Sequence, residues 1–445
     1  MHKIKTFISK IADWEYTPLC LLIAASLFLH FSLIMKPNTQ AFDESFYVDS
    51  ARSIINGDGN VLMVHPPLGQ AFVAVGILIF GDNPFGWRFF SVIFGTVALV
   101  LFYLICRQLK LTKYTSITAT FLLGIENLSF VQSSVAMLDV YSVTFMFLSF
   151  WLYLKGKYWL AGISVGLCVL AKLPGVLTLF AIVLHSLITN RKVFRRVFLL
   201  AAISAVTFFT LLVLIDIPIF RRFMNPLEHL HELTTVMIAL TFPSSLEGYK
   251  WLFPSRPWQW LYQFNGYSWW WFDAAGKKFE LYMWINPLIW ISIVPGVIYL
   301  TWTAIKRNSA AIFLLCWFGA TYLSWIPTSL ISNRISFDYY FYPTVGVICV
   351  AISMAITKLQ GIKNRSTKTS IAVRFIIPVY FAATLICFIY AFLKTGVGGV
   401  NLILAGVLYT LVFFFCDRSQ YVAKMQQDTG TRVTPGQFYG YNKTS

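Results

Sequence analysis

Long apolar runs separated by short polar segments dominate this chain of 445 residues. A helix needs about 20 residues to cross a hydrocarbon core of roughly 30 Å, and many of the runs approach that length. They lack the two-residue alternation of transmembrane barrels. The pattern therefore predicts an all-α integral membrane protein with about twelve transmembrane helices. The expected spans are 17–35, 86–106, 114–131, 138–154, 158–171, 174–189, 197–217, 285–305, 309–326, 339–357, 375–393 and 399–416.

The run from Tyr158 to Ile188 could form one long helix, but it is interrupted at Lys172-Leu173-Pro174-Gly175. Basic residues flank both of its ends, and basic residues favour the cytoplasmic side of a membrane. A single span would place one basic cluster outside, whereas two short spans keep both inside. Because proline suits the first turn of a helix, we predict a turn at this point and a returning helix after it.

Two long segments are expected on the outer side of the membrane. The first contains the apolar stretch from Pro66 to Phe80, which is too short to span comfortably and predicts an interfacial or re-entrant helix. The second is rich in tryptophan and tyrosine, as is typical of the headgroup region. The expected parts are a cytoplasmic N-terminus (1–16), an N-terminal transmembrane catalytic module (17–217) with its outer loop (36–87), the aromatic-rich outer loop (218–284), a C-terminal transmembrane module (285–416) and a cytoplasmic tail (417–445).

Composition supports the membrane class. The chain is 58% hydrophobic and 12% charged, whereas soluble domains carry about 25% charged residues. The net charge of +17 comes largely from short loops expected on the cytoplasmic side, so nucleic-acid binding is not expected. The seven cysteines stand singly, without metal-ligand spacing, and are expected to pack in the core. The first run lacks a small-residue cleavage site, which predicts a retained span rather than a signal peptide.

Two acidic sites on the outer side are candidates for chemistry. Asp43 and Glu44 follow the first span, where burial and neighbouring cations can tune a carboxylate for general-base work; an ordinary solvated loop is the alternative. Asp139 opens the fourth span on the same side, where an ionisable group is costly unless it is paired or functional. It is also a candidate helix N-cap.

Basic residues on the same side are candidates for holding a lipid phosphate, because charge-assisted bonds to phosphate oxygens are strong. Each could instead extend to ordinary headgroups. His65 precedes two prolines and could donate to a phosphate or orient Asp43; an ordinary loop histidine is the alternative. The basic candidates are Arg88, Lys172, Arg256 and Arg334.

Several short motifs stand out in chain order: Phe42-Asp43-Glu44, His65-Pro66-Pro67-Leu68-Gly69-Gln70, Trp87-Arg88-Phe89-Phe90, Met137-Leu138-Asp139, Pro254-Ser255-Arg256-Pro257-Trp258-Gln259-Trp260-Leu261 and Ile285-Asn286-Pro287-Leu288-Ile289-Trp290. Together they resemble the protein O-mannosyltransferases, which have the C-type glycosyltransferase (GT-C) fold. The similarity covers about residues 15–350.

This resemblance implies inverting transfer of a hexose, expected to be mannose, from a polyprenyl or dolichyl phosphate to Ser or Thr hydroxyls of a protein on the extracytoplasmic face. It implies that Asp43 is the general base and that Glu44 shapes the acceptor site. His65 and Arg88 would support the donor phosphate or the fold of the loop, and Asp139 matches the acid of the family's second outer loop.

Some features depart from the family pattern. Residues 218–284 are too few for the β-trefoil insert of eukaryotic members, which indicates a prokaryotic form in the plasma membrane. Gln70 replaces the usual Lys or Arg, and Asp338-Tyr339-Tyr340-Phe341-Tyr342-Pro343 matches a Tyr-His-Tyr pattern only loosely. One additional C-terminal span is expected. Because of these departures, the resemblance does not identify the acceptor.

Two other functions remain open from the sequence. Aminoarabinose transferases, which are related, move a sugar to a lipid, but they usually have Lys where His65 stands. A secondary transporter should have paired broken helices in two halves, and only the break at Pro174 is evident. A cleft beside Asp43 with an acyl groove to the bilayer would favour the enzyme. The expected partners are the lipid-linked donor, an acceptor protein or peptide and the bilayer; an oligomer and a divalent metal are left open, with no ligand spacing that requires the metal.

Overall fold

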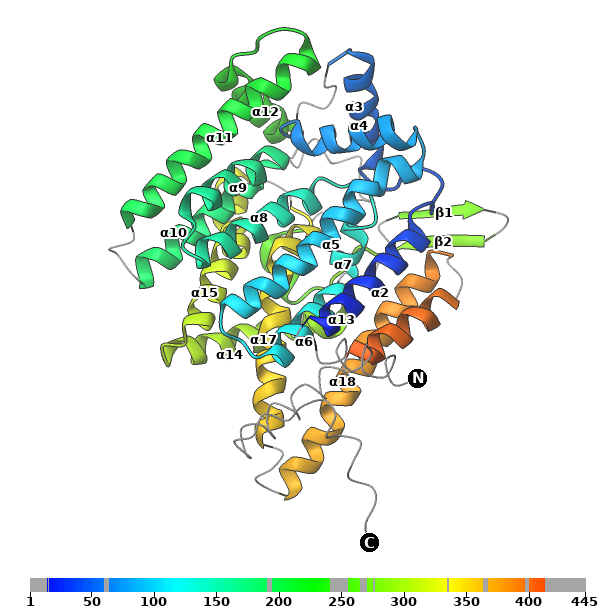
Figure 1. The fold of residues 1–445 in the computed structure, drawn as a ribbon, viewed down its shortest axis with the longest axis vertical. Helices are drawn as coiled ribbons and strands as arrows, with labels where there is room; N and C mark the ends of the chain where they lie inside the picture. The colour runs from blue at the N-terminus through cyan, green and yellow to red at the C-terminus, as the bar shows by residue number, and fades with distance from the viewer. Residues whose placement is uncertain are drawn as a thin grey trace.

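Helices form nearly all of the regular structure in the computed structural model (Figure 1). It describes residues 14, 16–59, 64–189, 194–240, 255–264, 270–274, 277–333, 336–362, 367–396 and 400–412. The N-terminal helices are α2 (Thr17–Leu33), α3 (Glu44–Asn56), α4 (Leu68–Phe80), α5 (Pro84–Gln108), α6 (Lys113–Gly124), α7 (Asn127–Gln132), α8 (Asp139–Leu154), α9 (Tyr158–Ala171), η1 (Leu173–Val176), α10 (Leu177–Thr189), α11 (Phe194–Phe220) and α12 (Pro226–Leu240). The later elements are η5 (Pro257–Leu261), β1 (Trp270–Ala274), β2 (Lys277–Leu281), α13 (Pro287–Ile291), α14 (Ile293–Ile305), α15 (Ser309–Phe318), η6 (Gly319–Leu323), α16 (Trp325–Ser332), η7 (Asp338–Phe341), α17 (Tyr342–Ile362) and α18 (Thr367–Lys394), with a further helix at Val400–Val412.

Five described helical stretches are long and apolar enough to cross a membrane. They are Pro84–Gln108, Arg195–Phe220, Ser309–Ser332, Asp338–Gln360 and Phe375–Lys394, and several shorter apolar helices accompany them. The chain is an integral membrane protein, as its apolar pattern predicts. The number of twelve spans stays a prediction, because some expected spans are divided. Residues 114–131, for example, form two helices separated at Ile125-Glu126.

The interrupted run after Tyr158 forms two short helices, as predicted. Helix α9 ends at Ala171, the 3-10 turn η1 follows, and α10 starts at Leu177. Gly175 lies against the end of α9 so closely that an added Cβ would come within 2.5 Å of the Cys168 carbonyl oxygen. The turn therefore needs glycine at this position, and it places Lys172 where the chain reverses.

The first outer segment forms two helices between α2 and α5. Helix α4 confirms the short helix predicted within Pro66–Phe80. Helix α3 was not predicted, although Tyr47, Val48 and Ala51 lie on one buried face at helical spacing. Both helices lie at the upper end of the bundle in Figure 1, together with α12.

The second long segment has more regular structure than a bare loop. It contains α12 and an antiparallel hairpin of β1 and β2. Trp270 lies opposite Leu281 at one end of the hairpin, and Ala274 lies opposite Lys277 at the other. The described part of the chain thus includes this one hairpin, but helices form nearly all of its regular structure, and the all-α class is confirmed. Backbone pairing within the hairpin satisfies amide groups that an irregular loop would leave to solvent.

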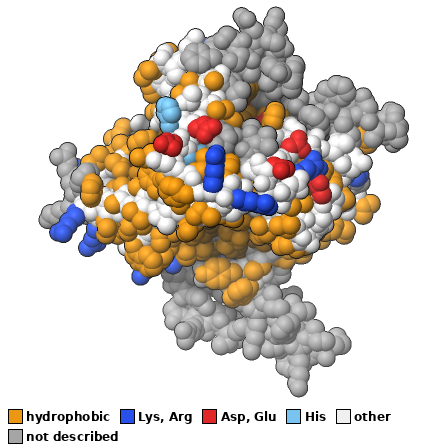
Figure 2. Space-filling view, turned by 90° about the horizontal axis from the view of Figure 1, so that it is seen from above, with side chains coloured by type: hydrophobic (Ala, Val, Ile, Leu, Met, Phe, Trp, Pro, Cys, Tyr) orange, Lys and Arg blue, Asp and Glu red, His pale blue; other side chains and the backbone are white. Residues whose placement is uncertain are grey.

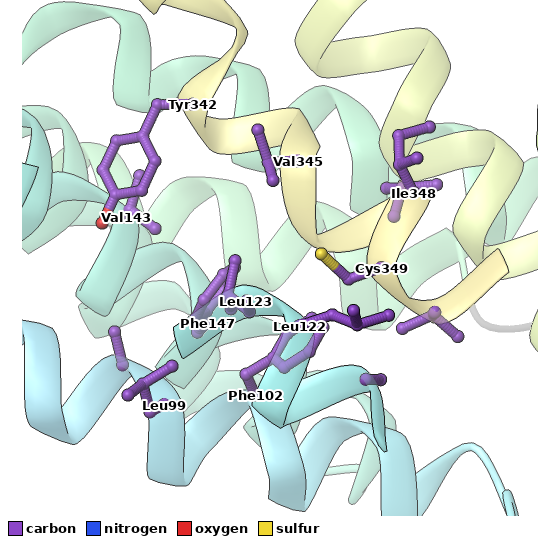
Figure 3. Packing of buried hydrophobic residues seen from close by; sticks show 14 of the residues in the cluster. Leu99, Phe102, Leu122, Leu123, Val143, Phe147, Tyr342, Val345, Ile348 and Cys349 are labelled. Atoms are coloured by element: carbon purple, nitrogen blue, oxygen red, sulfur yellow. The ribbon is translucent and has the colours of Figure 1, made fainter. Parts of the chain in front are cut away.

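The main core forms where α5, α6, α8 and α17 meet (Figure 3). Leu99 and Phe102 of α5 face Leu122 and Leu123 of α6, while Val143 and Phe147 come from α8 and Val345, Ile348 and Cys349 from α17. All of these side chains are buried. Because α17 brings the C-terminal half against N-terminal helices, the two predicted modules share one core.

Candidate active site

A buried ion pair fixes the start of the first outer segment. Glu44 and Arg88 are both 0% exposed, and their closest charged atoms lie 2.7 Å apart. The Glu44 carboxylate also accepts hydrogen bonds of 2.7 Å from the backbone amides of Ala41 and Ala136. These four bonds join α3, α5 and the turn before α8 at one point.

Arg88 uses all of its donors within the protein. A guanidinium has five N–H groups: two bond to Glu44, and three bond to the backbone oxygens of Ile34, Pro37 and Thr39. These distances are 2.7–3.0 Å. Of the two roles expected for Arg88, its contacts favour the fold of the loop over direct contact with a donor phosphate.

Asp43 directly precedes Glu44 of this ion pair. The preceding residue, Phe42, has a φ of +55°, a left-handed conformation that is uncommon for a bulky side chain. Asp43 is partly buried, and burial raises the pKa of its carboxyl from 3.8 to about 6. Lys172 opposes that shift in pKa and Asp139 adds to it. A carboxylate of this kind is a better proton acceptor near neutral pH than an ordinary aspartate.

Asp139 and Lys172 form a second buried pair next to Asp43. Asp139 is the first residue of α8, and Lys172 directly follows α9. Lys172 Nζ donates to Asp139 Oδ2 at 2.6 Å, and the two side chains are only 7% and 8% exposed. An ammonium has three donors, so this bond leaves Lys172 with capacity for a phosphate oxygen. The structure thus brings together Asp43, Asp139 and Lys172. Asp43 and Asp139 are 96 positions apart in the chain, and Asp139 and Lys172 are 33 positions apart.

Aromatic side chains from the C-terminal half line the same place. Lys172 Nζ lies 5.7 Å from the centre of the Tyr339 ring, and Phe42 meets that ring edge-on at 5.6 Å. Tyr340 stacks on Trp325 at 4.8 Å. Tyr47 also belongs here, because Asp43 and Asp139 both contribute to raising the pKa of its hydroxyl, after burial as the main cause. Tyr339 and Tyr340 belong to the motif that matches the Tyr-His-Tyr pattern only loosely, and the sequence gives them no role in the site. Tyr47 follows Asp43 by one helical turn, which could have indicated its position.

Two hollows adjoin the pair of Asp139 and Lys172. A small cavity of about 30 Å³ extends from it between α8, η1 and α10. A larger apolar groove of about 480 Å³ lies between α9, α10, α11, α12 and α16, and includes Leu173 and Pro174. Both hollows are lined by Pro174, Leu177 and Trp325. The groove therefore begins directly beyond the residue that could hold a phosphate.

The other predicted site residues are placed as follows. Arg256 donates to Ser329 Oγ at 2.9 Å and to Asn333 Oδ1 at 2.6 Å, which places its guanidinium at α16. His65 stands partly buried just before α4. Arg334 lies outside the described residues.

The two later motifs of the sequence lie against each other. Trp290 Nε1 donates to the Trp260 carbonyl at 2.8 Å, and Asn286 caps α13 through Leu288. The Tyr322 hydroxyl donates to the Pro257 carbonyl at 3.0 Å. These contacts hold η5 against α13 and η6. The Trp260 ring also meets the Tyr340 ring edge-on at 6.4 Å, so the first of these motifs contacts the aromatic side chains of the site.

Charged side chains gather on the face seen from above in Figure 2, over hydrophobic flanks. Arg52 bridges Asp49 and Asp82, and its guanidinium lies 5.6 Å from the centre of the Trp87 ring. Within the described ranges, His, Cys, Asp and Glu form no cluster of three or more that could hold a metal ion.

Comparisons with known proteins agree on the fold and the family domain. Residues 20–233 match the model of the family "Dolichyl-phosphate-mannose-protein mannosyltransferase" (PMT). A polyprenol-phosphate-mannose–protein mannosyltransferase of Mycobacterium tuberculosis is 32% identical over 150 residues, which cover 32% of this chain and 29% of that protein. The chain thus spans less than a third of the curated relatives it matches.

Solved structures with the same fold include membrane glycosyltransferases of the GT-C type. The protein O-mannosyltransferase Pmt1-Pmt2 complex of S. cerevisiae, bound to its sugar donor, matches with a TM-score of 0.69 and 12% identity over 87% of this chain and 90% of that chain. ArnT from Cupriavidus metallidurans bound to undecaprenyl phosphate matches with a TM-score of 0.55 and 16% identity over 94% and 81%. At these identities the likeness establishes the fold alone, and the prediction of a GT-C fold is confirmed.

Proposed function

We propose that this chain, which carries a PMT family domain over residues 20–233 in a GT-C fold, transfers mannose from a polyprenyl phosphate to Ser or Thr hydroxyls of a protein. The observation that carries the proposal is the position of Asp43. Its partly buried carboxylate faces the Asp139–Lys172 pair, and an apolar groove starts just beyond Lys172.

In the proposed reaction, Asp43 accepts the proton of the acceptor hydroxyl while the oxygen attacks the anomeric carbon of the sugar. The bond between that carbon and the phosphate oxygen breaks on the opposite side, so the configuration inverts. The leaving polyprenyl phosphate keeps the bonding electrons, and Asp43 holds the proton until solvent removes it. A hydroxyl is a weak nucleophile at neutral pH, so the base contributes directly to the rate.

Lys172 would stabilise the charge that develops on the leaving phosphate. Asp139 holds the ammonium at 2.6 Å and so fixes its position before the donor arrives. Preorganised cations of this kind act strongly where water is excluded. Glu44 and Arg88 would act indirectly, because they fix the backbone next to Asp43.

The groove of about 480 Å³ suits the polyprenyl chain. Its walls are mainly apolar side chains, among them Leu173, Phe208 and Phe209, and it meets the site at Pro174 and Leu177. A donor lying there would have its phosphate near Lys172 and its isoprene units along α10 and α11. Two proteins of the same fold support this placement, because the S. cerevisiae complex is bound to its sugar donor and ArnT is bound to undecaprenyl phosphate.

Transfer to a lipid or glycan is the second candidate, favoured by the structural likeness to ArnT. The family domain and the higher TM-score of the mannosyltransferase complex support a protein acceptor instead. We place the site on the extracytoplasmic face of a prokaryotic plasma membrane, because the basic loops would then lie inside. An oligomer remains compatible with this assignment.

The test supplies the purified full chain with radiolabelled undecaprenyl-phosphate mannose as the donor. The acceptor is either a Ser- and Thr-containing peptide or lipid A. We expect label to enter a Ser- and Thr-containing peptide and not an otherwise identical peptide with alanine at those positions. Labelling of lipid A with no labelling of the peptide would support the second candidate. Absence of transfer to either acceptor would contradict both.

A further inference from the structure

Helix α12 forms one wall of the apolar groove although it follows a long membrane-spanning helix. Leu230, Thr234 and Met237 of α12 line the groove opposite residues of α9 and α10. In Figure 1, α12 lies beside the upper end of α11. The chain reverses between the two helices at residues 221–225, where Arg221 has a φ of +53° and Asn225 Oδ1 accepts from the Leu227 amide at the start of α12.

A buried pair joins α12 to α11 close to this reversal. Asp216 of α11 and His229 of α12 are both 0% exposed, and Asp216 Oδ2 lies 2.6 Å from His229 Nδ1. The Phe220 ring meets the imidazole edge-on at 5.9 Å. His229 precedes Leu230 of the groove wall by one position, so this bond also fixes the start of the wall.

The proposed transfer reaction does not use this pair. Asp216 lies within the apolar stretch Arg195–Phe220, where an ionisable residue is expensive and usually has a function. Asp216 Oδ1 and His229 Nε2 are also buried and bond to no described residue. Each side chain therefore depends on the other, because removing one leaves the other in a poorly solvated position.

We propose that Asp216 and His229 are positioning residues that hold α12 as the groove wall and so give the protein its affinity for long polyprenyl chains. This inference rests on the proposed function, because it takes the groove to be the site of the donor lipid. The pair acts through α12 and does not contact the phosphate, which belongs near Lys172. Loss of the wall should weaken binding of long chains and spare a short chain that ends near the headgroup.

The geometry distinguishes a single substitution from a double one. In His229→Leu, the Asp216 carboxylate would face an apolar side chain, and α12 would have to move to let water reach it. In Asp216→Leu/His229→Leu, neither helix carries a stranded polar group, and two apolar side chains can pack in place of the pair. The double variant should therefore recover the wall that the single variant loses.

The experiment measures equilibrium binding of undecaprenyl phosphate and of geranyl phosphate to the purified full chain in detergent. We expect His229→Leu to weaken undecaprenyl phosphate binding about tenfold, which corresponds to about 1.4 kcal/mol, and to leave geranyl phosphate binding unchanged. The double variant should bind undecaprenyl phosphate within about threefold of the wild type. His231→Leu is the matched control, because His231 is exposed on the same helix, and it should bind both lipids like the wild type.

Three results would overturn the inference: unchanged undecaprenyl phosphate binding in His229→Leu, equal losses for the long and short lipids, or a double variant as weak as the single one. A variant that fails to fold would lose binding of both lipids equally, so retained geranyl phosphate binding shows that His229→Leu is folded. Mannose transfer by the wild type is measured in parallel. A wild type that binds the lipid but transfers no mannose would refute the proposed function, while the binding data would still decide the role of the pair.

Discussion

Glu44 and Arg88 meet through two hydrogen bonds, both 2.7 Å long, with neither side chain exposed to solvent. The carboxylate belongs to the residue directly after Asp43, so this contact sets the backbone from which the proposed base extends. The same carboxylate reaches the Ala136 amide, three residues before Asp139. One ion pair therefore fixes two of the three charged residues of the candidate site relative to each other.

Replacing Arg88 with Lys should destabilise the fold. Lysine cannot reproduce the paired bonds to Glu44 and the three bonds to backbone oxygens, and breaking a buried pair costs about 3–5 kcal/mol. Thermal unfolding in detergent would measure the loss. Arg52→Lys is the control, because Arg52 forms partly exposed ion pairs that should be worth less than about 1 kcal/mol. Equal losses in the two variants would contradict the structural role of Arg88.

Asp43→Asn should stabilise the protein above about pH 6. Burial raises the carboxyl pKa from 3.8 to about 6, so the folded state binds this proton more tightly than the unfolded state. The cost of ionising the group is fully present above pH 6, declines as the pH falls through that value and vanishes below about pH 4. It amounts to at most about 3 kcal/mol. Unfolding at pH 8 and at pH 4 should therefore give a gain only at pH 8; a loss of stability at pH 8 would contradict the assigned pKa.

The rate of transfer should follow the ionisation of the same carboxyl. Because the proposed base must be ionised, kcat/KM should rise with pH up to about 6 and then level off. Initial rates at low donor concentration, measured across this range, would define the midpoint. A profile that is flat between pH 4.5 and 7 would exclude Asp43 as a base with this pKa.

Lys172→Met should lower kcat by about 10²–10³, the usual effect of removing one group that stabilises developing negative charge. It should also move the acid limb of the pH profile upward, because Lys172 lowers the pKa of Asp43 and its removal leaves Asp139 unneutralised. Lys155→Met is the control, since Lys155 lies over the Trp151 ring at the far end of α8. A reduced rate with an unshifted pH profile would contradict the influence of Lys172 on the pKa of Asp43.

The sequence predicted much of the fold because hydropathy and charge encode it directly. The turn at Lys172 could be predicted from proline and from basic residues on both sides of the run, and the structure has that turn. The position of Asp139 on the same side as Asp43 followed from the order of the spans. Helix α3 could have been predicted from the spacing of Tyr47, Val48 and Ala51. The short amphipathic stretch was obscured by the acidic residues around it.

The pairing of side chains could not be predicted in the same way. Glu44 was expected to shape the acceptor site, and Arg88 to support the phosphate or the loop. In the structure they bond to each other, and Glu44 also accepts from the Ala136 amide while Arg88 also donates to the Thr39 carbonyl. No hydrophobic periodicity identifies these backbone partners. The Asp216–His229 pair is a similar case, because it depends on how α12 turns back onto α11. Tertiary packing selects these partners from many residues of the right type.

The most direct test of the central claim compares the wild type with Asp43→Asn in donor binding and in mannose transfer to a Ser- and Thr-containing peptide. The Asn side chain keeps the size of Asp but cannot accept the hydroxyl proton. We predict a fold of at least wild-type stability, undecaprenyl-phosphate binding within about threefold of the wild type, and transfer reduced by at least about 10². Transfer by Asp43→Asn at the wild-type rate would contradict the assignment of Asp43 as the base.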